Sequence, residues 1–140
     1  NMKYLYVLLL TLTVNACSGQ RNQKTEESNY EQETGIDLLV DYLERRGVTK
    51  LFGLCGHTVI GMLDALSRSK KIEYIGTRHE AVASTAADGY ARITHKASVV
   101  MCHLGPGLTN VLTGVANASL DSIPMVVIAG DVPSYYFGRH

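Results

Sequence analysis

The sequence predicts an α/β protein with three layers, in which helices cover both faces of a parallel sheet. The first observation is that short, continuously apolar segments alternate along the chain with segments of helical periodicity. The second is composition: hydrophobic residues make up 46% and charged residues 19% of the 140 residues, which is enough apolar material for a core. A chain of this length forms about one domain. We expect that domain to be incomplete at its C-terminus, because the final YYFGRH does not resemble a chain end.

The first 17 residues differ from the rest and resemble an export signal. Lys3 precedes an apolar run over residues 4–14, which is too short to span a bilayer as a helix and suits a signal-peptide core. The segment ends in VNAC, similar to a bacterial lipoprotein signal whose cysteine, here Cys17, is lipidated after cleavage. The alternative is a buried hydrophobic helix, although the run has no polar face. Residues 18–33 are polar and almost free of aliphatic side chains, which predicts a disordered linker.

The folded domain is predicted over residues 34–140. Residues 34–47 have apolar side chains at helical spacing, and Gly47 is placed to end that helix at C′. Further helices are expected over 59–69, 78–92 and 108–120. Strands are expected over 50–54, 72–76, 97–104 and 124–130, with a turn at 105–107.

Charge and cysteine content exclude several classes of function. Thirteen basic and thirteen acidic residues cancel, and no basic stripe is visible, so nucleic acid is not expected as a partner. The three cysteines are widely spaced, unlike a disulfide framework or a zinc site. The five histidines include no i, i+4 pair and no spacing that suits a metal, so no metal ligand is predicted. Asp88 and Arg92 form an i, i+4 pair that is most simply a structural ion pair.

Four loops are expected to gather at one edge of the sheet. In parallel α/β sheets, the ligand lies beyond the carboxyl ends of the strands. The segments that follow the predicted strands are CGHT, TRHE, CHLGPG and AGDV. They would bring Glu80, three histidines and Asp131 to the same edge.

Two of these loops contain glycines that would let backbone approach a ligand. GLCG at 53–56 precedes a helix and could hold an anion, but it lacks the signatures of a P-loop and of a dinucleotide site. A tight strand-to-helix turn is the better interpretation of that segment. In HLGPGLTN at 103–110, Gly105 and Gly107 permit unusual backbone angles, and Pro106 fixes one between them. An ordinary turn explains the same pattern.

Glu80 allows two interpretations. In the first, Thr77 is the N-cap and Glu80 the N3 residue of a capping box, which contributes about 1 kcal/mol and requires no function. In the second, Glu80 is a buried acid that takes part in chemistry. The small side chains that follow it, in AVASTAADGYA, would let another helix or a subunit approach closely. A carboxyl group desolvated there could exchange a proton near neutrality. The local pattern alone favours the cap.

Three segments together resemble one family in order and spacing: FGLCGHTV, RHEAVASTAADGYAR and LGPGLTNVLTGVANASLDSIPMVVIAGDVP. They are similar to the N-terminal, pyrimidine-binding domain of thiamine-diphosphate-dependent enzymes, in the acetohydroxyacid synthase branch. The resemblance implies a carboligase or decarboxylase, a transferase or lyase, that acts on 2-keto acids or aldehydes with thiamine diphosphate as electron sink. The alternative is a non-catalytic, membrane-tethered lipoprotein whose α/β domain binds a ligand or a partner.

The resemblance also implies the residues of the site. The glutamate at the position of Glu80 would hydrogen-bond N1′ of the cofactor's aminopyrimidine and favour the tautomer whose exocyclic nitrogen removes the thiazolium C2 proton. Pro106 and Asn110 would border the pyrimidine, and Leu54 with Gly56 would lie on its other side.

Other features differ from the family or are missing from it. Cys55 and His57 stand where acetohydroxyacid synthases usually have Pro and Gly, and Asp131 replaces the usual Gln, so no particular product is implied. The Gly-Asp-Gly…Asn motif that holds Mg²⁺ and the diphosphate belongs to a later domain and does not occur in these 140 residues. We therefore expect the chain alone to bind the cofactor weakly or not at all, and to be inactive.

Assembly and location follow from the same resemblance. In this family the site forms between two subunits, which implies a homo-oligomer, a dimer or a tetramer. A cytoplasmic location is implied as well, and it conflicts with the export-type leader. Lipid anchoring to a bacterial membrane through Cys17 is the alternative.

Overall fold

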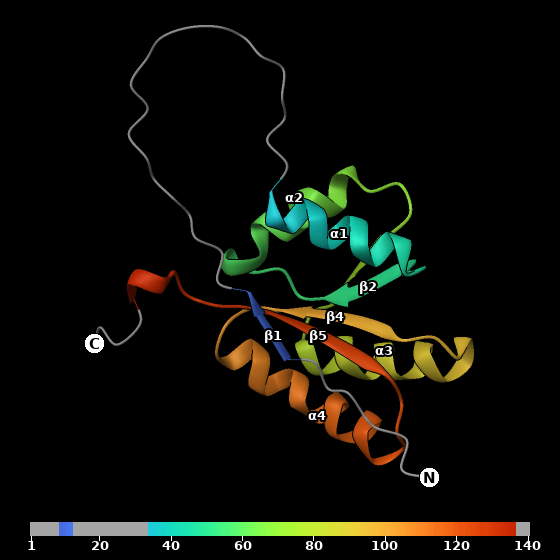
Figure 1. Ribbon diagram of the computed structural model, residues 1–140. Coiled ribbons are helices and arrows are strands. Elements are labelled where there is room, and N and C mark those ends of the chain that lie inside the picture. Colours follow the sequence, from blue (N-terminus) through green and yellow to red (C-terminus); the bar gives the residue numbers. More distant parts are fainter. Residues whose placement is uncertain (1–8, 13–33, 137–140) are drawn as a thin grey trace, which may run out of the picture.

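The computed structural model describes residues 9–12 and 34–136, in which strands and helices alternate (Figure 1). The elements in chain order are β1 (Leu9–Leu12), α1 (Gly35–Arg45), β2 (Lys50–Gly53), a 3-10 turn η1 (His57–Val59), α2 (Ile60–Arg68), β3 (Glu73–Gly76), α3 (Glu80–Thr94), β4 (Ser98–Cys102), α4 (Pro106–Leu120), β5 (Met125–Gly130) and a second 3-10 turn η2 (Ser134–Tyr136). Every helix and strand that we predicted in residues 34–130 is present, with ends that differ by a few residues.

All strand pairs in the sheet are parallel, in the order β1-β5-β4-β2-β3. Val99 on the central strand β4 lies opposite Leu51 of β2 on one side and Val126 of β5 on the other. The predicted α/β class is confirmed, since parallel strands joined by helices form the sheet.

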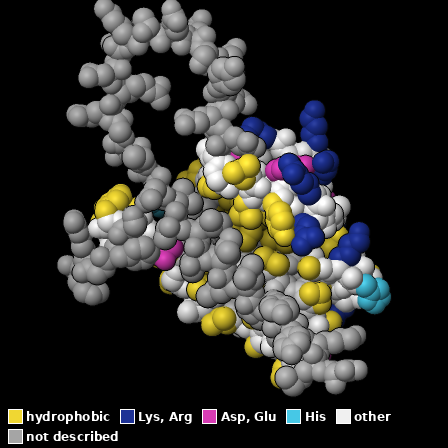
Figure 2. All heavy atoms as spheres, in the orientation of Figure 1, with side chains coloured by type: hydrophobic (Ala, Val, Ile, Leu, Met, Phe, Trp, Pro, Cys, Tyr) yellow, Lys and Arg dark blue, Asp and Glu magenta, His cyan; other side chains and the backbone are white. Residues whose placement is uncertain are grey.

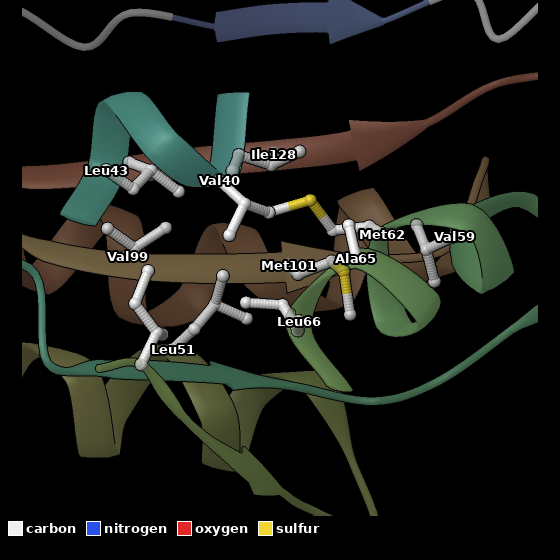
Figure 3. Packing of buried hydrophobic residues seen from close by; sticks show 11 residues of the cluster. Val40, Leu43, Leu51, Val59, Met62, Ala65, Leu66, Val99, Met101 and Ile128 are labelled. Carbon is white, nitrogen blue, oxygen red and sulfur yellow. The ribbon is translucent and has the colours of Figure 1, made fainter. Parts of the chain in front are cut away.

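Helices cover both faces of this sheet: α1 and α2 lie on one face, and α3 and α4 on the other (Figure 1). Alternate side chains of β4 point to opposite faces, as the pleat of a strand requires. Val99 and Met101 therefore belong to the core beneath α1 and α2, which Figure 3 shows in detail. Val100 and Cys102 belong to the core beneath α3 and α4. Every residue of β4 is buried, which explains why all of them except Ser98 are apolar.

Both ends of α1 are capped. At its start, Thr34 and Asp37 form a capping box, in which each side chain accepts a hydrogen bond from the other residue's backbone N–H. At its end, Gly47 has a φ of +78°. Its N–H bonds to Glu44, and the next N–H, of Val48, bonds to Leu43, which is a Schellman motif. The predicted role of Gly47 at C′ is confirmed.

One strand was not predicted. β1 pairs with β5 at the edge of the sheet and lies within the apolar run that we interpreted as part of a leader. A short apolar run has no periodicity that separates a strand from other buried structure, so its sequence alone did not reveal the pairing. The rest of the leader and the predicted linker at 18–33 lie outside the described residues, so those predictions, including lipidation of Cys17, stay predictions. Among the described residues, no helix has the length and apolar character needed to cross a membrane.

Candidate functional site

The strand order places a topological switch between β2 and β4. The chain runs from β2 outward to β3, and then returns so that β4 lies on the other side of β2. At such a switch, the connections that follow the two neighbouring strands diverge and leave space for a ligand. Those connections begin with residues 54–56 after β2 and 103–105 after β4. Because all strands are parallel, α3 and α4 also begin at this edge.

Helix α3 begins at Glu80, and its N-cap is His79 rather than Thr77. His79 has an extended backbone, and its Nδ1 accepts a hydrogen bond of 3.1 Å from the N–H of Ala81. Thr77 is instead tied to the sheet, since its N–H donates to the carbonyl oxygen of Gly53 at 2.8 Å. Its hydroxyl donates to the same carbonyl at 3.2 Å. The capping-box interpretation is therefore wrong, and the carboxyl group of Glu80 is not used to cap its own helix.

The side chain of Glu80 reaches across to α4 and is only 7% exposed. Its Oε2 accepts a hydrogen bond of 3.0 Å from Nδ2 of Asn110, in the second turn of α4. The other oxygen, Oε1, faces Gly107, where an added Cβ would lie 3.3 Å away. No side chain of the described residues donates a hydrogen bond to Oε1. One carboxylate oxygen is thus held in place, and the other remains free to bond a ligand.

A buried thiol and the N-terminal end of a helix lie close to the carboxyl group of Glu80. Cys102, at the end of β4, is fully buried. Burial, and secondly the nearby Glu80 carboxylate, raises the pKa of the Cys102 thiol to about 11. The thiol is therefore neutral at pH 7 and adds no second charge to the site. Glu80 is the first residue of α3, where the helix dipole places a partial positive charge.

Close packing of α3 on α4 holds Glu80 and Asn110 together. Ser84 on α3 is buried, and a Cβ added to Gly114 of α4 would lie 2.5 Å from its Cβ. Ser84 follows Glu80 by four residues, and Gly114 follows Asn110 by four. The tightest contact between the helices is therefore about one helical turn below the Glu80–Asn110 bond. The small side chains of α3 are used for a helix–helix contact, one of the two arrangements expected from the sequence.

A second polar contact joins the same helices further along. Oδ2 of the buried Asp88 accepts hydrogen bonds from Nε of Arg92 at 3.0 Å and from Nδ2 of Asn117 at 2.7 Å. Arg92 also pairs with Asp121, just beyond the end of α4. These carboxylates raise the pKa of the Arg92 guanidinium. The predicted Asp88–Arg92 ion pair is present, and its place between α3 and α4 makes it structural.

The loops after β2 and β4 meet through His103. Nδ1 of His103 lies 2.7 Å from the hydroxyl oxygen of Thr58. A Cβ on Gly56 would lie 2.6 Å from Cγ of the same ring, so only glycine fits there. A Cβ on Gly107 would lie 3.3 Å from Cβ of His103. His103 therefore connects the β2 loop with the glycine beside Glu80. The sequence did not predict this contact, because 45 residues separate His103 from Thr58 and no local pattern links the two.

The glycines of HLGPGLTN have different roles. Gly105 has a φ of +54°, which confirms that glycine is needed there for its backbone conformation. Gly107 is helical, and a Cβ there would lie only 3.3 Å from both Glu80 Oε1 and His103 Cβ, so a side chain would fit only if these neighbours moved slightly. The predicted turn at 105–107 is correspondingly shorter, since Pro106 is already the first residue of α4.

The other candidate residues lie at the same edge but contact Glu80 less directly. Leu54 is half-buried in the loop after β2. Gly56 packs against His103, and His103 in turn packs against Gly107, the glycine beside Glu80. Asp131 follows β5, and its Oδ1 accepts a hydrogen bond of 2.7 Å from the N–H of Val132. Within residues 9–12 and 34–136, no three His, Cys, Asp or Glu side chains are placed to hold a metal ion.

Most of the chain is similar to one family of known proteins. Residues 33–140 match the family described as thiamine pyrophosphate enzyme, N-terminal TPP binding domain. The acetolactate synthase large subunit of Buchnera aphidicola subsp. Schizaphis graminum is 45% identical over 105 residues, which are 75% of this chain and 18% of that protein. The acetolactate synthase isozyme 1 large subunit of Escherichia coli (strain K12) is 42% identical over 105 residues, 75% of this chain and 19% of that protein. The acetolactate synthase of Mycobacterium avium is 44% identical over 102 residues, which are 73% of this chain and 16% of that protein. The chain thus spans less than a fifth of the length of these curated relatives.

Proposed function

Since this chain belongs to the thiamine pyrophosphate enzymes, as their N-terminal TPP-binding domain, we propose that it holds the aminopyrimidine of thiamine diphosphate against Glu80. The observation that carries the proposal is the buried carboxylate of Glu80, in which Oε2 is bonded to Asn110 and Oε1 has no hydrogen-bond partner among the described residues. The enzyme served by this domain would be a carboligase or decarboxylase for 2-keto acids or aldehydes. The similarity to acetolactate synthases over 105 residues supports that class of reaction.

The residues around Glu80 fit an aminopyrimidine ring. A ring nitrogen that shares a proton needs a carboxylate oxygen without another partner, and Oε1 meets this requirement among the described residues. A flat ring also needs a neighbour without a side chain. Gly107 meets that need, because a Cβ there would lie 3.3 Å from Oε1. Pro106 and Asn110, which flank Gly107 on the first turns of α4, are suited to border the ring.

The chain's own residues would position the ring, and one of them would transfer a proton to and from it. Thiamine diphosphate, when bound, supplies an electron sink for the cleavage or formation of a bond beside a carbonyl group. Glu80 would hold a proton at Oε1 and exchange it with the ring nitrogen, as a general acid–base. Asn110 donates to Oε2 and so keeps Oε1 directed at the ligand. Cys102 and the tight α3–α4 contact exclude water from the inner side of Glu80.

We also propose that other parts of the complete enzyme finish the site. The diphosphate and Mg²⁺ would be bound by a domain outside these 140 residues, contributed by a second subunit of a homo-oligomer. The length of the relatives supports this, because the chain matches only 18% of the Buchnera protein. A cytoplasmic location, where the cofactor is available, completes the proposal.

The test compares Glu80→Gln with Glu73→Gln in the complete enzyme. The measurement is the rate at which the cofactor's C2 proton exchanges with deuterium, followed by NMR after acid quenching. We expect Glu80→Gln to slow the exchange by about 100-fold or more, the usual size of a general acid–base contribution. Glu73 is an exposed glutamate of β3 that pairs with Lys50, so its variant should exchange at the unmodified rate. Equal rates in all three proteins would show that Glu80 has no such role.

A further inference from the structure

A cavity of about 450 Å³ opens at the edge of the sheet opposite to Glu80. Its wall includes Leu43 and Gly47 at the end of α1, and Val99 and Val126 near the starts of β4 and β5. In a parallel sheet, the amino ends of the strands lie at one edge and the carboxyl ends at the other, so this cavity is separate from the site at Glu80. Its volume lies within the range of about 300–1,000 Å³ that is typical of small-molecule sites.

The charges of the cavity have one sign. Arg46 and Lys96 both line it, and no carboxylate does. Within the part of the chain that the structure describes, neither cation forms an ion pair. The remaining wall is largely apolar, with Tyr42, Leu43, Val99 and Val126. Figure 2 shows one face of the molecule, on which hydrophobic side chains lie beside Lys and Arg side chains.

Arg46 is already held in position for an anion. Its Nε donates a hydrogen bond of 3.0 Å to the hydroxyl of Tyr42, and its guanidinium lies 5.3 Å from the centre of the Tyr42 ring. The hydrogen bond uses Nε, and among the described residues the terminal N–H groups of Arg46 form no hydrogen bond, so they can bind two oxygens of one carboxylate. Ordering this side chain in advance lowers the entropy that a ligand must offset on binding. The neighbouring Arg45 is different, because it pairs with Asp41.

We propose that this cavity binds an amphipathic monocarboxylate, whose aliphatic or aromatic body lies against Leu43, Val99 and Val126. Its carboxylate would be bound by Arg46 and Lys96. Charge complementarity favours an anion over a neutral ligand, since two cations that form no ion pair with any described residue line the site. The apolar wall favours a ligand with a hydrocarbon body over an inorganic anion, because only the former removes that surface from water.

The test uses the full chain with ¹³C-methyl-labelled valine and 3-phenylpropanoate as the probe. We expect titration to shift the methyl resonances of Val99 and Val126, and to leave those of Val82, exposed on α3, unchanged. 3-Phenylpropanamide, which has the same shape without the charge, and inorganic phosphate, which has charge without the apolar body, should each bind at least about tenfold more weakly.

Matched arginine variants locate the binding site. Arg46→Gln should weaken 3-phenylpropanoate binding by about tenfold, the usual effect of losing a charge-assisted hydrogen bond. Arg45→Gln, one residue away and outside the cavity, should leave the affinity unchanged. Both arginines are exposed, so both variants should fold, which circular dichroism will verify. Equal affinity for the carboxylate and the amide, equal effects of the two variants, or unshifted Val99 and Val126 resonances would each overturn the proposal. None of these results depends on thiamine diphosphate.

Discussion

Replacing Gly114 with alanine tests the contact that holds the candidate site together. Gly114 lies in the interior of α4, against Ser84 of α3. An added Cβ would lie 2.5 Å from Cβ of Ser84 and 2.6 Å from its backbone carbonyl carbon. Because the second of these atoms belongs to the backbone, rotating the Ser84 side chain cannot relieve the overlap. The helices must therefore move apart.

The expected effect on stability is the difference between two opposing terms. Alanine in a helix interior is about 1 kcal/mol more favourable than glycine. Carbon atoms in contact are normally about 3.5 Å apart, so the helices must separate by roughly 1 Å. Overpacking of this kind costs about 1–3 kcal/mol, and a backbone clash belongs at the upper end. We expect a net loss of about 2 kcal/mol. The same movement would lengthen the 3.0 Å bond between Glu80 and Asn110, about one turn away, beyond hydrogen-bond distance.

Thermal unfolding followed by circular dichroism measures the stability of the variant. A loss of about 2 kcal/mol lowers the Tm of a domain of this size by roughly 10 °C. Gly89→Ala, in the middle of α3, is the matched control, because outside the nearby backbone of α3 itself no atom of the described residues lies within 4 Å of its added Cβ. It should raise the stability by up to about 1 kcal/mol through helix propensity alone.

A second variant distinguishes a backbone clash from a side-chain clash. Ser84→Gly combined with Gly114→Ala removes the side chain that the new methyl meets first, but leaves the backbone carbon 2.6 Å away. The double variant should therefore recover only part of the lost stability. A Gly114→Ala protein that unfolds at or above the temperature of the unmodified chain, or a complete rescue in the double variant, would refute the packing described here.

Two further predictions concern cysteines. The pKa of the Cys102 thiol is about 11 in the folded protein, whereas the ordinary value, expected in the unfolded chain, is 9.0. The unfolded chain therefore loses this proton at a lower pH than the folded protein does. The free energy of unfolding should fall as the pH rises from 9 to 11. Urea denaturation across that range should show a smaller fall in Cys102→Ala, and parallel curves for the two proteins would contradict the buried thiol. For Cys17, the proposed cytoplasmic location predicts no incorporation of radioactive palmitate in growing bacteria. Incorporation that disappears in Cys17→Ser would instead demonstrate a lipid anchor.

Much of the fold could be predicted because it depends on local patterns. The apolar run at 97–104 indicated a strand buried on both faces, and β4 is buried at every position. Gly47 was placed correctly at the end of α1, since a left-handed residue there is a local requirement of the backbone. Thr77 shows the limit of such patterns. Its spacing to Glu80 suited a capping box, but a hydrogen bond to Gly53 keeps it in the sheet and makes His79 the cap.

The sequence by itself determined the layered α/β class, the edge at which the loops gather, and the choice of Glu80 as the acid of interest. Only the tertiary structure decided what surrounds that acid. Asn110 is 30 residues from Glu80, and Thr58 is 45 residues from His103, so neither contact has a local signal. Both depend on how α3, α4 and the β2 and β4 loops pack around the switch in strand order. Helix periodicity and capping act over a few residues, whereas the partner of a buried carboxylate is chosen by packing between distant segments, and that choice exists only once the chain has folded.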